Sequence, residues 1–158
     1  MVDVSTLARA GYIAVFAAIF LIDLRTRIIP NAITYPAIAA ATLIRPDGVG
    51  LVPLPNVLAG VVAAAIVAAF ALRDWMGMGD AKLVLLIGLV SGPALTVVGI
   101  WLGVVSGGLT SMLLIATGRA TRKDLIPFGP FLAAAATAAL LVGDRIIEWS
   151  GLSYLFGT

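Results

Sequence analysis

The stretch NVLAGVVAAAIVAAFAL, residues 56–72, contains no charged side chain, and Asn56 is its only polar one. A helix of this length covers most of the roughly 30 Å hydrocarbon core of a bilayer, because each residue adds about 1.5 Å. Apolar runs of similar character occur on both sides of it. We therefore predict an all-α fold, a polytopic transmembrane helix bundle.

The composition of the whole chain supports this prediction. Of 158 residues, 61% are hydrophobic and 11% are charged, and the mean hydropathy is +1.13. A soluble domain could not bury so much apolar surface. We expect residues 1–158 to form a single integral membrane domain, with membrane lipid as its surroundings.

Charges, prolines and glycines divide the chain into about six apolar segments. The predicted spans are residues 5–22, 32–44, 56–72, 77–92, 94–117 and 128–147. The second is short for a span, and Gly92-Pro93 is the only break between the fourth and the fifth.

Basic residues predict the orientation, because cytoplasmic connections of membrane proteins are enriched in Lys and Arg. With the N-terminus outside, seven of the ten basic residues fall on or near cytoplasmic connections: Arg25, Arg27, Arg73, Lys82, Arg119, Arg122 and Lys123. Arg9, Arg45 and Arg145 fall outside. We therefore expect both termini outside, with Asp23 and Asp80 on the cytoplasmic side.

Several chemistries are excluded by composition. The chain has no cysteine and no histidine, which removes disulfides, cysteine nucleophiles, Ser-His-Asp triads and zinc sites built on imidazole or thiolate. We expect no metal and no cofactor. The basic residues are dispersed between spans and form no dense patch, so a nucleic-acid partner is not expected either.

Two aspartates are the candidates for chemistry, since ionisable groups beside membrane spans need a partner, a polar cavity or the interface. Asp23 ends the first span, and Asp80 lies in Gly77-Met-Gly-Asp-Ala-Lys82 where the fourth begins. Each also has a purely structural interpretation. Asp23 could pair with Arg27, and Asp80 could cap a helix N-terminus. Asn31 is a good N-cap for the second span.

Two convergent carboxylates on one side of the membrane can hydrolyse a peptide. Held close together in a poorly solvated site, they cannot easily both ionise, so the pair can share a proton. One then activates water while the other protonates the leaving group. Their individual roles stay open, because a coupled pair titrates as a unit.

At these residues the sequence resembles the type IV prepilin peptidases, membrane aspartic proteases with a Gly-x-Gly-Asp signature. Asp23, followed six residues later by Ile29-Pro30-Asn31, is similar to the first aspartate motif of the family. Gly77-Met-Gly-Asp-Ala-Lys82 is similar to the second, and Ile126-Pro-Phe-Gly-Pro130 to a late proline-rich motif. The three motifs occur in family order over most of the chain.

The resemblance implies a prepilin leader peptidase of the plasma (inner) membrane, with its active site near the cytoplasmic face. It implies Asp23 and Asp80 as the catalytic pair, with Gly77 and Gly79 as a hinge for Asp80. The substrates would be prepilin or pseudopilin precursors with a short basic leader and a hydrophobic helix. The further residues expected to bind or position the substrate are Pro30, Asn31, Lys82, Pro127 and Gly129.

The larger bacterial members of that family carry an additional cytoplasmic segment, often with cysteine pairs, and methylate the new N-terminus. Nothing in this sequence corresponds to that segment. We therefore expect peptidase activity without methyltransferase activity.

Other functions stay open at this point. A lipoprotein signal peptidase also uses two aspartates, but it works from the outer face with four spans. A Ser-Lys protease using Lys82 lacks a well-placed serine. A small transporter or assembly scaffold could use Asp23 and Asp80 as an ion or proton site. The oligomeric state is open too, although Gly99, Gly103 and Gly107 clear one helix face for a close neighbour.

Overall fold

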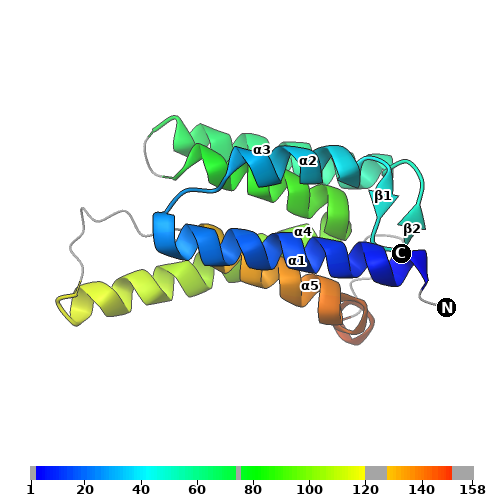
Figure 1. The fold of residues 1–158 in the computed structure, drawn as a ribbon. Coiled ribbons are helices and arrows are strands. Elements are labelled where there is room, and N and C mark those ends of the chain that lie inside the picture. Colours follow the sequence, from blue (N-terminus) through cyan, green and yellow to red (C-terminus); the bar gives the residue numbers. More distant parts are fainter. Residues whose placement is uncertain (1–2, 74–75, 120–127, 151–158) are drawn as a thin grey trace.

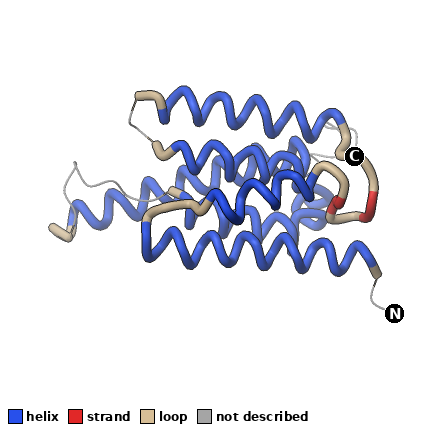
Figure 2. Tube along the Cα trace, turned by 45° about the horizontal axis from the view of Figure 1, so that its top comes forward, coloured by secondary structure: helices blue, strands red, loops and turns tan. Residues whose placement is uncertain are grey.

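The computed structural model describes residues 3–73, 76–119 and 128–150, with side chains as far as residue 143. Its helices are α1 (Val4–Thr26), α2 (Asn31–Ala41), α3 (Leu54–Ala71), α4 (Met78–Ala116) and α5 (Gly129–Ser150). A small antiparallel hairpin of β1 (Ile44–Arg45) and β2 (Gly48–Val49) follows α2. Figures 1 and 2 show the helices side by side along one common direction.

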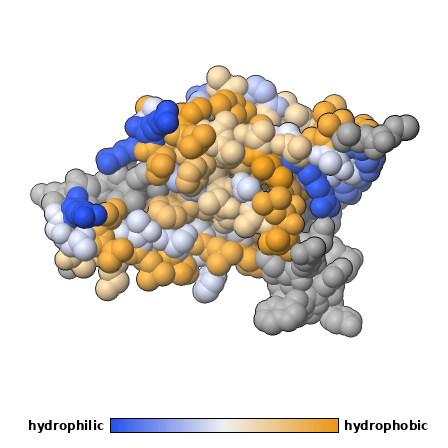
Figure 3. All heavy atoms as spheres, turned by 60° about the horizontal axis from the view of Figure 1, so that its bottom comes forward, coloured by the Kyte–Doolittle hydropathy of each residue, from blue (hydrophilic) through white to orange (hydrophobic). Residues whose placement is uncertain are grey.

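The surface has the character of a membrane protein. Three described helices, α1, α3 and α4, are long and apolar enough to cross a membrane. On the face shown in Figure 3, an apolar band covers the middle and hydrophilic residues gather toward the two ends. Large apolar side chains of α3, such as Leu58, Val62 and Ile66, are more than half exposed. The predicted helical membrane class is therefore confirmed.

The predicted run 32–44 is wrong at its C-terminal end. Helix α2 has 11 residues and ends at Ala41, a length of about 16 Å that is too short for a span. The chain then forms the hairpin, in which Gly50 and Val52 donate backbone hydrogen bonds to Leu43 and Thr42, at 2.9 and 3.0 Å. The all-helical expectation missed these strands, because they are two residues long and carry no alternating pattern.

Helix α4 contains the break expected at Gly92-Pro93. Its 39 residues would measure about 58 Å as a straight rod, but Gly92 has φ 75° and ψ 177°, a conformation that glycine adopts without strain. Figure 1 shows the chain turning back there, so the two halves of α4 run in opposite directions. The side chain of Asn56 donates a hydrogen bond of 3.2 Å to the Leu89 carbonyl just before the break, which satisfies one of the carbonyls left at a helix end.

The first half of α4 is the centre of the core. Leu83, Val84, Leu86 and Ile87 have no exposed surface. Helix α3 packs directly on this half at Gly88, where an added Cβ would collide with the backbone of Gly60. Two glycines facing each other let the helix backbones approach more closely than larger side chains would allow.

The second half of α4 packs against α5. A Cβ on Gly103 would meet Leu132 at 2.8 Å, and one on Gly107 would meet Phe128 at 2.9 Å. A Cβ on Gly99 would have no neighbour within 4 Å. Two of the three glycines that predicted a cleared helix face therefore serve a contact within the chain.

Gly88→Ala should destabilise the protein, because the new methyl group meets backbone that cannot rotate away. We expect a loss of about 1–3 kcal/mol in the free energy of unfolding, measured by thermal unfolding in detergent. The matched control is Gly108→Ala in the same helix, where an added Cβ meets nothing. The control should be neutral or more stable by up to about 1 kcal/mol, and equal stability of the two variants would contradict the packing described.

Candidate active site

Asp23 is buried at the end of an otherwise exposed helical turn. It lies in the last turn of α1 and is 3% exposed, whereas Leu24 is 59% exposed. The helix stops four residues later, where Arg27 takes the left-handed conformation and donates its backbone N–H to the Asp23 carbonyl at 2.8 Å. The carboxylate therefore points into the bundle.

Asp80 is buried at the start of α4. It is the third residue of the helix and is 6% exposed. Its Oδ2 accepts a hydrogen bond of 3.1 Å from the backbone N–H of Gly77, the N-cap residue. The sequence suggested that Asp80 could cap the N-terminus of a helix. Asp80 does bond to the backbone at the start of α4, but it does so from the third helical position and is not the N-cap residue.

The two aspartates lie near each other although 57 positions separate them in the sequence. Asp23 ends α1 at the same end of the bundle where Asp80 begins α4 (Figure 1). Ile29 lies between the segments that carry them, 8% exposed, and its Cβ and Cδ1 lie 3.0 Å from where a Cβ would stand on Gly79 and on Gly129. The ends of α1, α4 and α5 therefore meet around one isoleucine.

Gly129 forms the closest approach in this site. An added Cβ at this buried residue would collide with Oδ2 of Asp23 and stand 3.0 Å from its Cγ. The start of α5, which carries the last part of the late proline-rich motif, therefore covers the Asp23 carboxylate directly. Close packing at this position requires a glycine.

This arrangement suits acid–base chemistry without a covalent intermediate. Two carboxylates with little contact with water lie at one end of an apolar bundle, where they cannot easily both carry a charge. A pair that shares one proton can both take a proton from water and give one to a leaving group.

Comparison with models of known protein families gives a match over most of the chain. The model of the type IV leader peptidase family matches residues 10–142, which include both aspartates and Gly129. The chain belongs to the type IV leader peptidase family.

Relatives of this leader peptidase family member carry the name prepilin leader peptidase/N-methyltransferase. The protein of Bacillus subtilis (strain 168) is 32% identical over 141 residues, which are 87% of this chain and 56% of the relative. That of Aeromonas salmonicida (strain A449) is 33% identical over 152 residues, 91% of this chain and 52% of the relative. The chain thus spans about half the length of the curated relatives it matches. No solved structure matches it.

Two local expectations for this leader peptidase domain are wrong. Pro30, not Asn31, is the N-cap residue of α2, and its carbonyl accepts hydrogen bonds from the backbone of Ile33 and Thr34 at 3.1 Å. Among the described residues, Arg27 forms no ion pair with Asp23; its side chain is exposed. The left-handed backbone at Arg27 ends the helix before the two side chains can align.

Lys82 connects two elements beside the aspartates. Its Nζ donates a hydrogen bond to Oδ1 of Asn31, and it lies 5.1 Å from the ring centre of Tyr35. The contact joins the start of α2 to the start of α4. Lys82 thus holds the segment after Asp23 against the helix that carries Asp80, a position that spacing along the chain does not reveal.

Three further candidate residues, Gly77, Gly79 and Pro127, lie near the two aspartate motifs or in the late proline-rich motif. Pro127 lies outside the described residues. Gly77 is exposed with an extended backbone, and Gly79 is half-buried against Ile29; their role as a hinge stays a prediction. Ile29 was not proposed as a site residue, although it opens the motif Ile29-Pro30-Asn31 that the family resemblance had already marked.

Lys82→Met should weaken the connection between α2 and α4. We expect the free energy of unfolding to fall by about 1 kcal/mol, since a half-exposed charged hydrogen bond and a cation–π contact are lost. Asn31→Ala should add little in the Lys82→Met background, and a double-mutant cycle by thermal unfolding measures this. Arg73→Met, an exposed residue after α3, is the control, and purely additive effects of Lys82→Met and Asn31→Ala would argue against the contact.

Proposed function

We propose that this chain is a membrane aspartic endopeptidase that removes the leader peptide of prepilin-like proteins, with Asp23 and Asp80 as the catalytic pair. The observation that carries the proposal is the burial of these two carboxylates at the same end of the bundle (Figure 1), in a chain of the leader peptidase family. The proposal takes the leader peptidase half of the relatives' name. It does not extend to methyl transfer, in line with the sequence-based expectation.

In the proposed reaction, a water molecule enters between the two carboxylates and the scissile peptide. One carboxylate takes a proton as water attacks the carbonyl carbon, and the other gives a proton to the departing amine. After release of both products, the pair again holds one proton. The chemistry needs no covalent intermediate.

We further propose six membrane crossings with both termini outside and the aspartates at the cytoplasmic face of the plasma membrane. In the second crossing α2 is too short by itself, and the chain that follows it, with the β1–β2 hairpin, completes the path to the other end of the bundle (Figure 1). In support, Arg25, Arg73 and Arg119 follow or end the helices on the side where α4 begins with Asp80. Positive charge is enriched on the cytoplasmic side of membrane proteins. The hydrophobic helix of a substrate would then lie in the bilayer, with its basic leader reaching the aspartates.

Asp23→Asn and Asp80→Asn should each abolish cleavage, because an amide can neither take nor give the proton. We expect rates about 100- to 10,000-fold below wild type. The measurement is the shortening of a co-expressed prepilin on a gel, followed by N-terminal sequencing of the product. Asp3→Asn, an exposed residue near the N-terminus, is the matched control and should cleave normally.

Cleavage that survives in either variant would contradict the assignment of the pair. If the wild type cleaves no prepilin tested while uptake of an ion depends on Asp23 and Asp80, the transporter alternative takes the place of the peptidase proposal.

Gly129→Ala should inactivate the enzyme even though it leaves both aspartates unchanged. The new Cβ must displace the Asp23 carboxylate, and a misplacement of about 1 Å costs roughly 100-fold in rate. The same prepilin assay measures the loss, and circular dichroism checks that helix content is kept. The control is Gly11→Ala in α1, which adds a methyl group where nothing lies within 4 Å and should keep full activity. Full activity in Gly129→Ala as well would refute this role.

A further inference from the structure

An apolar groove runs between α3 and the second half of α4. Its volume is about 740 Å³. On α3 the lining residues recur every three or four positions from Pro55 to Val67, and on α4 they do so from Pro93 to Val104. Each helix therefore contributes one face to the groove. The groove is about three helical turns long, or roughly 16 Å.

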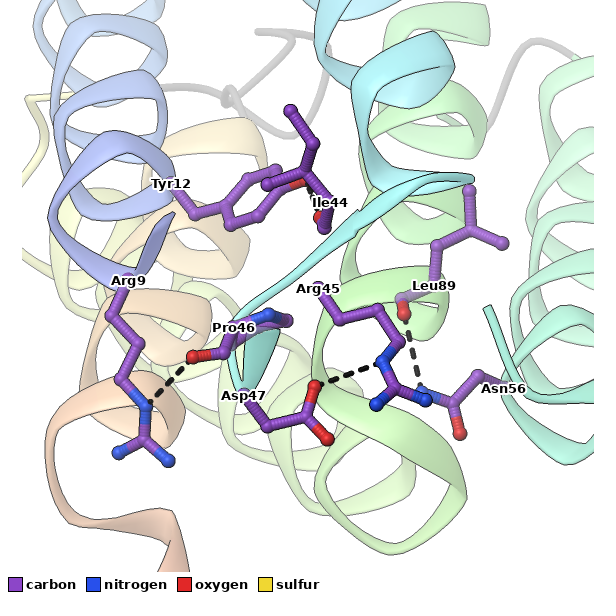
Figure 4. Close-up of polar contacts among 8 residues, drawn as sticks. All are labelled: Arg9, Tyr12, Ile44, Arg45, Pro46, Asp47, Asn56 and Leu89. Carbon is purple, nitrogen blue, oxygen red and sulfur yellow. Dashed lines mark hydrogen bonds and ion pairs between the residues drawn. The ribbon is translucent and has the colours of Figure 1, made fainter. Parts of the chain in front are cut away.

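The groove is a fixed feature of the fold. Helix α3 is held on the first half of α4 by the close approach of Gly60 to Gly88. Figure 4 shows a second contact at the start of α3, where the Asn56 amide donates its hydrogen bond of 3.2 Å to the Leu89 carbonyl. The second half of α4 is held on α5, where Gly103 packs against Leu132. The space between α3 and the second half of α4 is therefore left open.

The lining is almost wholly apolar. Thr96 is the one polar side chain among the described residues that line the groove, and its hydroxyl donates to the Gly92 carbonyl at 2.6 Å. Val62, Val97 and Trp101, along the two sides, are more than half exposed. The described lining offers no free polar group to hold a lipid headgroup or a charge. An occupant must therefore be apolar over the whole length of the groove.

The shape of the groove suits a helix. On α3 the small side chains of Ala59 and Ala63 are half-buried, whereas Leu58, Val62 and Ile66 beside them are more than half exposed. Small residues between rows of larger ones form the kind of groove into which the side-chain ridge of another helix packs. An apolar helix with large side chains at every third or fourth position matches this pattern.

The α3 side of the groove ends at the height of Asp80. Figure 1 shows α3 and the first half of α4 running in opposite directions. Seven residues from the contact of Gly60 with Gly88, toward the aspartates, lie Val67 on α3 and Ala81 on α4. Both are 6% exposed and belong to the same core. Val67 is the last lining residue on α3, so the groove reaches the turn that carries Asp80.

The α4 side of the groove ends close to the height of Asp23. Val104 is the last lining residue on α4 and lies three positions before Gly107. A Cβ on Gly107 would meet Phe128, and the next residue, Gly129, lies on the Asp23 carboxylate. The groove therefore ends about 5 Å, or one helical turn, from the height of Asp23.

We propose that this groove binds the hydrophobic helix of the precursor, with the beginning of that helix at the aspartate end. The inference rests on the proposed peptidase function and extends it to a docking surface for the part of the substrate that is not cut. The groove would hold about three turns of the helix along α3. The scissile bond, just before the helix, would then lie at the height of Asp23 and Asp80.

Cysteine crosslinking tests this placement, because the chain has no cysteine of its own. Val62→Cys is combined with Asp80→Asn, which keeps the precursor uncut, and co-expressed with a prepilin whose only cysteine lies in its hydrophobic helix. Membranes are oxidised and the joined product is measured on a gel. The matched control is Val61→Cys, which is equally exposed on the same helix but does not line the groove. We expect at least about tenfold more product with Val62→Cys.

The direction of the bound helix gives a second readout. Ile66→Cys should join the first turns of the precursor helix, and Leu58→Cys should join positions about eight residues further on, since the two sites are eight residues apart on α3. Equal products with Val61→Cys and Val62→Cys, or the reverse order along the precursor, would overturn the proposal. So would crosslinks of Val62→Cys between two copies of this chain in place of the precursor.

Filling the groove should slow cleavage. Ala63→Phe places a ring among the lining residues, and we expect the kcat/KM for prepilin to fall about tenfold, equivalent to about 1.4 kcal/mol of lost binding. Ala65→Phe makes the same change at an exposed position of α3 outside the lining and should cleave as the wild type does. Thermal unfolding checks that both variants fold, and the crosslinks decide the question if Ala63→Phe does not.

The two proposals fail in different ways. A wild type that cleaves no prepilin contradicts the peptidase function. A wild type that cleaves prepilin, together with wild-type rates in Ala63→Phe, contradicts only the binding of the precursor helix in this groove.

Discussion

The contact between Gly129 and the carboxylate of Asp23 determines how the ends of α1 and α5 meet. With no Cβ at residue 129, the start of α5 lies directly on the carboxylate. Ile29 then fills the space between Gly129 and Gly79, which brings the start of α4 and Asp80 to the same place. The burial of both acids thus depends on two glycines and one isoleucine.

Burying two carboxylates in an apolar bundle is unfavourable, and the structure offsets the cost only in part. Asp80 accepts a backbone N–H from Gly77, and no described cation forms an ion pair with Asp23 or Asp80. An isolated charge in such surroundings is strongly disfavoured. The fold therefore accepts an unfavourable burial at this end of the bundle, which packing of the surrounding helices must offset.

Several residues near the site show why local rules failed. Asn31 has the side chain of a good helix cap, but Pro30 takes the cap position and Asn31 bonds to Lys82 on another helix. Arg27 stands at a spacing that suits an ion pair with Asp23, but the helix ends there in a left-handed residue. A contact with another helix explains the role of Asn31, and a left-handed backbone residue explains why Arg27 does not pair with Asp23. Residue type and spacing alone predict neither.

The amino-acid sequence by itself determined the membrane class and the break at Gly92-Pro93, and it singled out Asp23 and Asp80 as candidates, because hydropathy, backbone restriction and rare ionisable groups are local properties. Only the tertiary structure decided that α2 is too short for a span, that Gly129 lies on Asp23, and that α3 and the second half of α4 line one apolar groove. These features depend on contacts between helices far apart in the chain, and such contacts arise from side-chain shape and close packing that spacing along the sequence does not encode.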